Sequence, residues 1–419
     1  MKTLLRNSCL LFILCHALNA QSLMIHHIDV GQGDATLIRV PNGKTVLIDA
    51  GNTGKGRNAV IPYLKALGVT SLDYLIVSHY HADHIGAVDE VIDALSPDSV
   101  RFVLDRGDAP PLPTSNAFSQ YRSAAERIPR HFAVTVGQTI NLSDDVTLRC
   151  LAGDGSVLGY SSPIADRTDE NGLSLVWLLS SGQLLNNNLY HFTYFTGGDC
   201  GGPTPSSADL ETPLAAIVGD VDAMKINHHG SRRSTSQLFL DSLRPGAVVI
   251  SVGDRNTYGH PAQEILDRIQ ASTSVRFIYQ TETGSGGTAP KVKVLGTIAI
   301  ALFDSFCTVG TDTFRIAPRT AIQKGTTSTD TPHINASAQG DIEASIDSGI
   351  LSFTLTASSF VSVRLYNLVG VDLRSLADGY FPAGTYHISL QGIGLPSGVY
   401  FVRLRTPFET LVRKAVVLR

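Results

Sequence analysis

Short apolar runs that end in glycine-rich or polar turns recur through the first two thirds of the chain. Their length and their Val, Ile and Leu content indicate buried strands, while apolar residues at helical spacing indicate helices between them. We predict strands at residues 23–30, 35–40, 45–49, 74–77, 100–104, 132–136, 146–151, 173–179, 190–196, 221–226, 247–251, 292–302 and 313–316. We predict helices at residues 59–67, 85 to about 95, 117–128, 237–243 and after Pro261. This alternation predicts two mixed sheets packed face to face with helices outside, an α/β fold.

The stretch DYLIVSHYHADHIGAV at residues 73–88 is the most informative part of this pattern. Open α/β sheets place ligand sites at the carboxyl ends of strands, where this strand ends at Ser78. The loop that follows supplies four candidate metal ligands, which are His79, His81, Asp83 and His84. Because their spacing prevents them from all facing one ion on regular secondary structure, we expect the first two histidines to bind one metal and the Asp-His pair a second. Imidazole and carboxylate suit one or two divalent ions, zinc first and manganese as the alternative.

Two later strands end in the same kind of chemistry. FTGGD at residues 195–199 ends in Asp199, which suits a ligand bridging two metals, although an aspartate in such a place is often only a turn residue. MKINHHGS at residues 224–231 presents His228 and His229, one of which would bind metal while the other reaches the substrate. Three strand ends with matching chemistry support one another.

Four more residues complete the candidate site. Asp29, Asp34 and Asp49 lie at strand ends, where they either orient the ligating imidazoles or simply cap turns. His260 precedes Pro261, which reads as the first helical residue, so His260 is expected at a helix N-terminus, where anions bind. There its imidazole could donate a proton or stabilise charge.

Composition narrows the class of protein. The chain has 419 residues, which is enough for two or more domains, and 43% of them are hydrophobic. Its formal net charge of −4 gives no basic footprint that would by itself indicate nucleic-acid binding.

The first twenty residues are typical of a cleaved export signal. Lys2 and Arg6 precede an apolar run at residues 10–14, and small residues allow cleavage after Ala20. An uncleaved anchor is the alternative, but the apolar run is too short to span a bilayer. Cleavage would leave three cysteines, too few and too irregularly spaced for a disulfide framework, although one pair could bridge: Cys150, Cys200 and Cys307. Cys200 follows Asp199 but is better explained as a small buried hydrophobe than as a ligand.

A change of composition divides the chain. We predict a domain with the candidate metal site at residues 21–318, a linker rich in Thr, Ser, Pro, Asp and Gly at 319–340, and a small all-β domain at 341–419. The last domain contains no cluster of catalytic residue types, and its His387 is expected to be a surface or packing residue.

The motifs together resemble the metallo-β-lactamase superfamily, and within it the hydrolase domain of ComEC-type competence proteins. HIDVGQGDATLI, LIDAG, LIVSHYHADHIGAV, FTGGD, KINHHGS and ISVGDRNTYGHP occur in order between residues 27 and 261. The resemblance implies an αββα sandwich with metal positions at His79, His81, Asp83, His84, Asp199 and His228, and substrate positions at His229 and His260. It departs from the superfamily where a further histidine is expected before Asp199. There DENGLS at residues 169–174 suggests Asn171 beside the first metal, whose occupancy is therefore in doubt.

The C-terminal domain resembles the sorting domain of the type IX (Por) secretion system. The matching stretches are VRLYNLVGVDLRSL, LPSGVYFVRL and the final VRKAVVLR. The resemblance implies recognition by outer-membrane secretion machinery and a secreted or cell-surface protein. A plain immunoglobulin-like accessory domain is the alternative.

The sequence therefore predicts a secreted metal-dependent hydrolase. Its most favoured reaction is attack of a metal-bound hydroxide on a phosphodiester, with nucleic acid among the expected substrates and catalytic roles for Asp83, His229 and His260. The alternatives are hydrolysis of an ester or lactam at the same site, or a non-catalytic surface-binding protein.

Overall fold

The computed structural model describes residues 22–143, 145–185, 188–205, 207–303, 305–316, 318–319, 322–324, 342–347, 349–356, 359–367, 372–381, 384–390, 395–406 and 410–417. The predicted export signal and most of the predicted linker lie outside these residues. The chain divides into two compact units, which are described separately: residues up to Leu179 with Thr193–Arg315, and Ser180–Phe192 with the residues from Ile316 onward. In the described part of the chain, no helix has the length and apolar character needed to cross a membrane.

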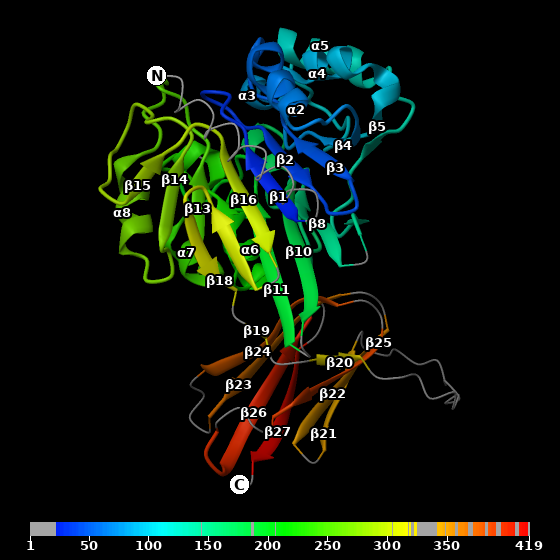
Figure 1. Cartoon of the computed structure of the whole chain (residues 1–419), viewed down its shortest axis with the longest axis vertical. Coiled ribbons are helices and arrows are strands. Elements are labelled where there is room, and N and C mark those ends of the chain that lie inside the picture. The colour runs from blue at the N-terminus through cyan, green and yellow to red at the C-terminus, as the bar shows by residue number, and fades with distance from the viewer. Residues whose placement is uncertain are drawn as a thin grey trace, which may run out of the picture. The chain divides into compact units, whose positions relative to one another are not determined.

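Two sheets form the framework of the first unit (Figure 1). The first sheet has the strand order β18-β17-β16-β1-β2-β3-β4-β5-β6. Its strands are β1 (Leu23–His27), β2 (Thr36–Arg39), β3 (Thr45–Ile48), β4 (Leu72–Ile76), β5 (Val100–Asp105), β6 (His131–Ala133), β16 (Ile298–Phe303), β17 (Phe306–Val309) and β18 (Asp312–Arg315).

The second sheet has the order β15-β14-β13-β12-β11-β10-β8-β7, with β9 paired to β8 and β19 (Pro318–Arg319) paired to β11. Its other strands are β7 (Thr139–Asn141), β8 (Val146–Gly153), β9 (Ser156–Val157), β10 (Val176–Leu185), β11 (Asn188–Thr196), β12 (Ala223–Lys225), β13 (Ala247–Ile250), β14 (Phe277–Gln280) and β15 (Val292–Val294). The strands β10 and β11 contribute residues to both units.

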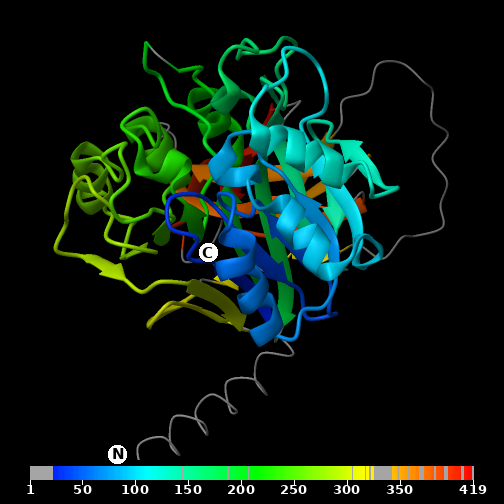
Figure 2. The same cartoon turned by 90° about the horizontal axis from the view of Figure 1, so that it is seen from above.

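Helices cover the outer face of each sheet (Figure 2). On the first sheet, Leu47, Leu75 and Val103 from adjacent strands share a buried core with residues of the helices. These helices are η2 (Gly56–Val60), α2 (Ile61–Ala66), α3 (Ala82–Ile85), α4 (Val88–Leu95), η3 (Pro97–Ser99) and α5 (Asn116–Ala125). On the second sheet, Phe195 of β11 packs edge-on against Phe239 of a helix at 5.3 Å. The remaining helices are η4 (Glu170–Leu173), α6 (Glu211–Val218), η5 (Asn227–Gly230), α7 (Gln237–Leu243) and α8 (Gln263–Ala271).

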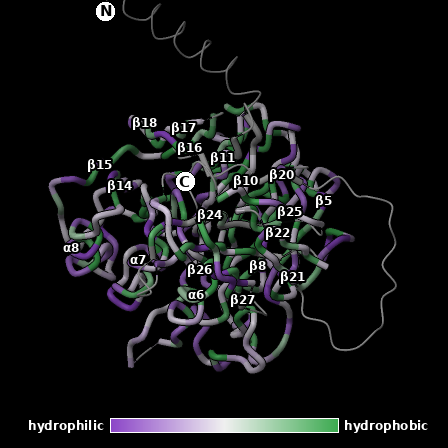
Figure 3. The backbone as a smooth tube through the Cα atoms, turned by 90° about the horizontal axis from the view of Figure 1, so that it is seen from below, coloured by the Kyte–Doolittle hydropathy of each residue, from purple (hydrophilic) through white to green (hydrophobic). Residues whose placement is uncertain are grey.

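One half of each sheet is parallel, and this places the functional loops together. Strands β3, β4, β5 and β6 pair in parallel in the first sheet, and β11, β12, β13, β14 and β15 do so in the second. β3 and β13 are buried at every position, as expected of parallel strands covered on both faces. Figure 3 shows hydrophilic stretches around α8, which covers this part of the second sheet. Parallel neighbours have their carboxyl ends at the same edge of a sheet. The loops after β3 and β4 therefore leave the first sheet at one edge, and the loops after β11, β12 and β13 leave the second sheet at one edge.

The predicted layering of two mixed sheets with outer helices is confirmed. Several local predictions differ from the structure. The single strand expected at residues 292–302 is two strands in different sheets, β15 and β16. The helix expected to begin at Pro261 begins at Gln263 with Ala262 as its N-cap, because Ala262 is still extended. The strand expected at residues 132–136 is the short edge strand His131–Ala133.

The second unit contains two four-stranded sheets with orders β20-β25-β22-β21 and β24-β23-β26-β27. Their strands are β20 (Ile322–Lys324), β21 (Ile342–Asp347), β22 (Ile350–Leu355), β23 (Ser359–Tyr366), β24 (Asp372–Phe381), β25 (Gly384–Ser389), β26 (Gly398–Arg405) and β27 (Thr410–Val417). Alternate residues of both sheets, such as Leu351, Phe353, Val363 and Leu365, form one buried core. The strands agree with an all-β domain, while its sorting role and immunoglobulin-like identity stay predictions.

Strand β1 ends in two buried histidines. His27 is completely enclosed, and neither ring nitrogen has a hydrogen-bond partner in the described structure. Its ring lies edge-on to Tyr194 at 5.7 Å between centroids. Burial, with a smaller contribution from Lys225, outweighs the attraction of Asp34 and lowers the pKa of His27 to about 3. The folded protein thus holds this imidazole neutral.

We expect His27→Phe to reduce the acid sensitivity of the first unit. Between pH 7 and pH 5 the unfolded chain protonates this histidine while the folded chain does not, so stability falls as the pH falls. The histidine should account for about 2 kcal/mol of that loss. Unfolding by urea can be followed through Trp177, a buried residue and the single tryptophan of the chain. An equal loss of stability in both proteins between the two pH values would contradict this prediction.

Candidate metal centre

His84 is oriented by the loop after β3. Its Nδ1 donates to Asp49 Oδ2 at 2.8 Å, which directs Nε2 toward the opposite sheet. Asp49 is itself held by Ser78, whose backbone N–H and hydroxyl donate to its two carboxylate oxygens at 2.8 and 2.7 Å. Carboxylates that fix an imidazole in this way set its tautomer and strengthen it as a ligand. Asp49 therefore has the orienting contact that the sequence suggested.

His229 is oriented from the second sheet. Its Nδ1 donates to the carbonyl oxygen of Ser251 at 2.9 Å, in the loop after β13. Its Nε2 then lies 3.4 Å from Asp83 Oδ2 and 3.5 Å from Asp199 Oδ2. This places an imidazole from the second sheet beside a carboxylate from the first.

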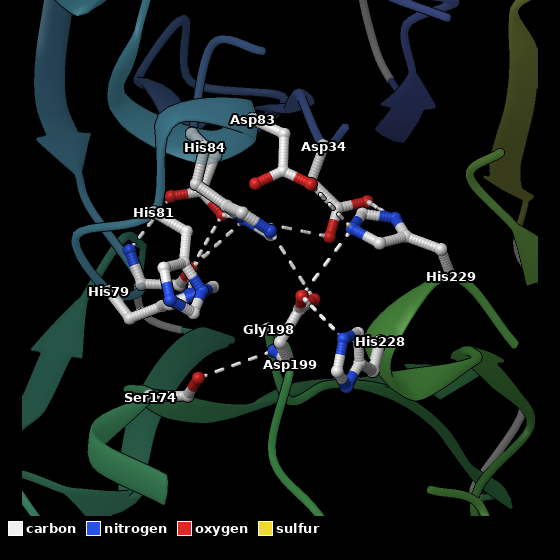
Figure 4. Close-up of polar contacts among 12 residues, drawn as sticks. Asp34, His79, His81, Asp83, His84, Ser174, Gly198, Asp199, His228 and His229 are labelled. Carbon is white, nitrogen blue, oxygen red and sulfur yellow. Dashed lines mark hydrogen bonds and ion pairs between the residues drawn. The ribbon is translucent and has the colours of Figure 1, made fainter. Parts of the chain in front are cut away.

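Asp199 lies at the centre of the group (Figure 4). Its Oδ1 is 3.3 Å from His84 Nε2, and its Oδ2 lies 3.5 Å from His229 Nε2 and 3.6 Å from His228 Nε2. Its backbone N–H donates to the hydroxyl of Ser174 at 3.3 Å. Burial alone would raise the pKa of Asp199, but the three imidazoles outweigh it and hold that pKa well below its usual value. The carboxylate is therefore ionised and faces imidazoles on both sides.

A buried ion pair lies next to the Asp199 carboxylate. Asp34, His84, Asp199 and His229 each offer a ligand atom, and these atoms all lie within 4.8 Å of one another. Asp34 is also paired with the buried Lys225, whose Nζ is 2.6 Å from Asp34 Oδ2 and donates to the carbonyl of Gly198 at 2.9 Å. Because a cation already neutralises Asp34, we assign it to charge balance and orientation of the site rather than to direct ligation.

The remaining donors fit a divalent metal. His84 Nε2, Asp199 Oδ1 and His229 Nε2 are buried and have no hydrogen-bond partner in the described structure, although they point at one another. Unpaired polar atoms in a protein interior are costly unless an ion or another ligand satisfies them. Burial opposes protonation of both histidines, but Asp199 with Asp49 raises the pKa of His84 well above its usual value, and Asp199 with Asp34 raises that of His229 to about 10. Imidazole nitrogens around a carboxylate are a donor set suited to zinc or manganese.

The first two histidines of the loop form a separate part of the site. His79 Nδ1 contacts the Ser78 hydroxyl at 3.1 Å, and its Nε2 lies 3.0 Å from His81 Nδ1. Burial, then His84 and His81, lowers the pKa of His79 well below its usual value, so this imidazole is neutral. Asn171 of η4 lines the same cavity, and its buried Oδ1 is without a hydrogen-bond partner in the part of the chain described. The structure thus brings His79 and His81 into contact, and Asn171 lines a cavity that His81 also lines.

An open cavity of about 950 Å³ lies over both groups. Its lining includes most of the predicted site residues together with an aromatic residue and two arginines: His81, Asp83, Asn171, Asp199, His228, His229, His260, Tyr258, Arg232 and Arg233. Gly33 allows the loop after β1 to approach the loop that carries Asp83. A Cβ there would lie 2.3 Å from the carbonyl oxygen of Asp83, so only glycine allows this approach of the loop after β1.

The structure changes three interpretations from the sequence. The resemblance assigned His228 as the ligand, but His229 is the deeper of the two and carries the anchored ring, while the His228 side chain is 18% exposed. His260 is not at a helix N-terminus, since α8 begins at Gln263; its ring instead stacks on Tyr258 at 5.6 Å. The Asp29 carboxylate accepts a hydrogen bond from Gly31 N, and thus caps a turn.

Several histidines and cysteines lie outside the site, and two of its supports were not predicted from the sequence. His131 lies 2.7 Å from the buried Asp105, and the three cysteines at positions 150, 200 and 307 are free and buried. The missed supports are Lys225 and the Ser251 carbonyl. Lys225 within an otherwise apolar strand was the only signal available, because an isolated buried lysine needs a partner.

Comparisons with known proteins agree with this fold. Residues 28–149 match the model of the metallo-β-lactamase superfamily, so this part of the chain has a metallo-hydrolase fold. "ComE operon protein 3" of Bacillus subtilis (strain 168) is 27% identical over 274 residues, covering 62% of this chain and 32% of that protein. "Competence protein ComA" of Neisseria gonorrhoeae is 25% identical over 251 residues, covering 58% of this chain and 29% of that protein. The chain thus spans about a third of the length of these curated relatives.

Among solved structures, the metallo-β-lactamase fold protein YhfI of Bacillus subtilis matches 65% of this chain and 96% of its own at 12% identity, with a TM-score of 0.36. The resemblance to the superfamily and to competence proteins is therefore confirmed at modest identity. The resemblance of the C-terminal domain to a sorting domain stays a prediction.

We expect His229→Ala to weaken zinc binding at least about 100-fold, because removing an anchored ligand should cost more than removing a residue that only orients one. His228→Ala should weaken it less than about tenfold, since that ring is part-exposed. Competition with a chromogenic chelator measures both constants on the full chain. The reverse order of the two effects would return His228 to the role of ligand.

Proposed function

We propose that the chain is a metal-dependent phosphodiesterase, one that an export signal and a C-terminal sorting domain deliver to the cell surface or the medium. The observation that carries the activity is the combination of metal donors and two free arginines in one cavity. Phosphodiesters of nucleic acid are among the substrates that fit this chemistry.

The arginines favour an anionic substrate. Arg232 and Arg233 are exposed, follow the His228–His229 turn directly, and line the cavity beside Asp199. No carboxylate within the described ranges forms an ion pair with either guanidinium. Planar guanidinium groups match the geometry of phosphate oxygens, and they would add nothing to binding of a neutral ester. This is why a phosphodiester is favoured over a neutral carboxylic ester.

A divalent metal held by His84, Asp199 and His229 with Asp83 would supply Lewis acidity at the phosphoryl oxygen and a nucleophile from water at neutral pH. The chain's own residues supply the rest of the chemistry. Although burial opposes it, the nearby imidazoles of His229 and His84 lower the pKa of Asp83, so this carboxylate is ionised beside the metal donors.

His260 also lines the cavity. Burial, with His229 and His228, lowers its pKa to about 4, so the ring is neutral at pH 7 and carries one N–H. That N–H can donate a hydrogen bond to a substrate oxygen as negative charge develops there. Tyr258, which is 68% exposed and stacks on His260, extends an aromatic surface at the cavity mouth. A substrate with a planar group next to the phosphodiester would fit against it.

Chelation is expected to abolish hydrolysis of bis-p-nitrophenyl phosphate, and added zinc or manganese should restore it, because the unpaired donors need an ion. Release of p-nitrophenol measures the rate before and after metal removal. Absence of turnover with any divalent metal would refute the phosphodiesterase and favour a surface-binding protein. Turnover of a β-lactam or a carboxylic ester without turnover of the phosphodiester would favour the other hydrolase class.

We expect Arg232→Gln combined with Arg233→Gln to raise KM for bis-p-nitrophenyl phosphate roughly tenfold or more, since a hydrogen bond to a charged group contributes about 1.5–3 kcal/mol. Hydrolysis of the neutral ester p-nitrophenyl acetate, where measurable, should not change. Arg57→Gln is the control, because Arg57 is exposed on η2 and does not line the cavity. An equal rise of KM in the double variant and in Arg57→Gln, or an unchanged KM in the double variant, would remove the argument for an anionic substrate.

A further inference from the structure

Glu211, the first residue of α6, is a fully buried carboxylate. Its Oε1 accepts hydrogen bonds from Asn227 Nδ2 at 2.9 Å and from the backbone N–H of Thr235, and its Oε2 accepts one from the backbone N–H of Ser236 at 2.7 Å. In the described structure no lysine or arginine forms an ion pair with it. A buried carboxylate without a cation is expensive, so the contacts that it makes need an explanation.

All three donors belong to one segment, residues 227–236, which carries both histidines of the turn and both arginines of the cavity. His228 and His229 have φ values of 49° and 53°, and Thr235 has a φ of 48°. These left-handed conformations are unfavourable for residues other than glycine and persist only when the surrounding structure imposes them. Glu211 contacts the residue before the two histidines and the backbone at the far end of the segment. It thus secures the turn at both ends.

The start of α6, including Glu211 itself, also contacts the loop that carries Asp199. The backbone N–H groups of Leu210 and Glu211 donate to the carbonyl of Gly201 at 3.1 and 3.2 Å. A Cβ added at Gly202 would lie only 2.6 Å from Glu211 Oε2, and one added at Gly197 would lie 2.6 Å from Asn227 Oδ1. The Asp199 loop therefore packs against the Glu211–Asn227 pair at two points, one before Asp199 and one after it.

We propose that Glu211 is a positioning residue of the metal centre, which holds the Asp199 loop and the His228–His229 turn in register. The proposal rests on the proposed function only in that these residues hold a metal. Without the carboxylate, the strained turn relaxes and the imidazole of His229 loses its alignment with Asp199. Metal affinity falls even though neither Glu211 nor Asn227 is a ligand.

The test is Glu211→Gln in the full chain, with the dissociation constant for zinc as the measurement. Glutamine has nearly the same size as glutamate, but its NH2 group cannot accept a hydrogen bond. At least one of the three hydrogen bonds is therefore lost. Residues that support ligands from outside typically change metal affinity by 10–100-fold, and we expect a weakening in that range.

Glu90→Gln is the matched control. Glu90 is also buried, and its two oxygens accept backbone hydrogen bonds from Gly54 and Arg57 at 2.8 and 3.0 Å. The loop that it holds carries none of the metal donors. We therefore expect a comparable loss of thermal stability in both variants, but a change in zinc affinity of less than about twofold in Glu90→Gln.

Equal zinc affinities in the two variants at equal stability would overturn the proposal, because Glu211 would then serve the fold alone. If Glu211→Gln does not fold, Asn227→Ala replaces it, since it cuts the link to the histidine turn and leaves the backbone hydrogen bonds of Glu211 in place. Zinc affinity unchanged in Asn227→Ala would overturn the proposal equally. Zinc binding that depends on Glu211 in a chain without phosphodiesterase activity would support this inference while refuting the proposed function. A parent chain that binds no zinc or manganese would refute both.

Discussion

The contact on which the site depends is the approach of the Asp199 carboxylate to imidazoles from both sheets. It lies 3.3 Å from His84, which the first sheet carries, and 3.5 Å from His229, which the second carries. Buried like this, one carboxylate and two imidazoles are tolerable only if charge and hydrogen bonding are balanced nearby, or if an ion occupies the space among them. The two sheets must therefore keep their relative position to a fraction of an ångström at this edge.

Each group at the centre has a support of its own. Asp49 and Ser78 set the ring of His84, and the Ser251 carbonyl sets that of His229. Lys225 holds Asp34 and the Gly198 carbonyl beneath the carboxylate. These supports lie at the ends of parallel strands that are buried on both faces. The ligands are therefore held by rigid elements of the sheets.

The cavity combines this rigid floor with a more accessible rim. The donors are buried, while Arg232, Arg233 and Tyr258 are exposed. A buried floor keeps the charges of the metal donors strong, because little water competes with them. An exposed cationic and aromatic rim suits a substrate that has an anionic centre and extends beyond the cavity, and this division agrees with a phosphodiesterase better than with an enzyme for small neutral esters.

Much of this could be predicted from the chain alone. The apolar runs predicted two layered mixed sheets, and the strand ends predicted that His84, Asp199 and the two histidines at 228 and 229 would meet, because ligand spacing and strand ends are local properties. Tertiary structure decided the rest. Which of His228 and His229 faces the centre depends on left-handed backbone angles and on the Ser251 carbonyl, which lies 22 residues away in sequence. The roles of Lys225 and Glu211 were equally hidden, because a buried charge has meaning only through partners that folding brings to it.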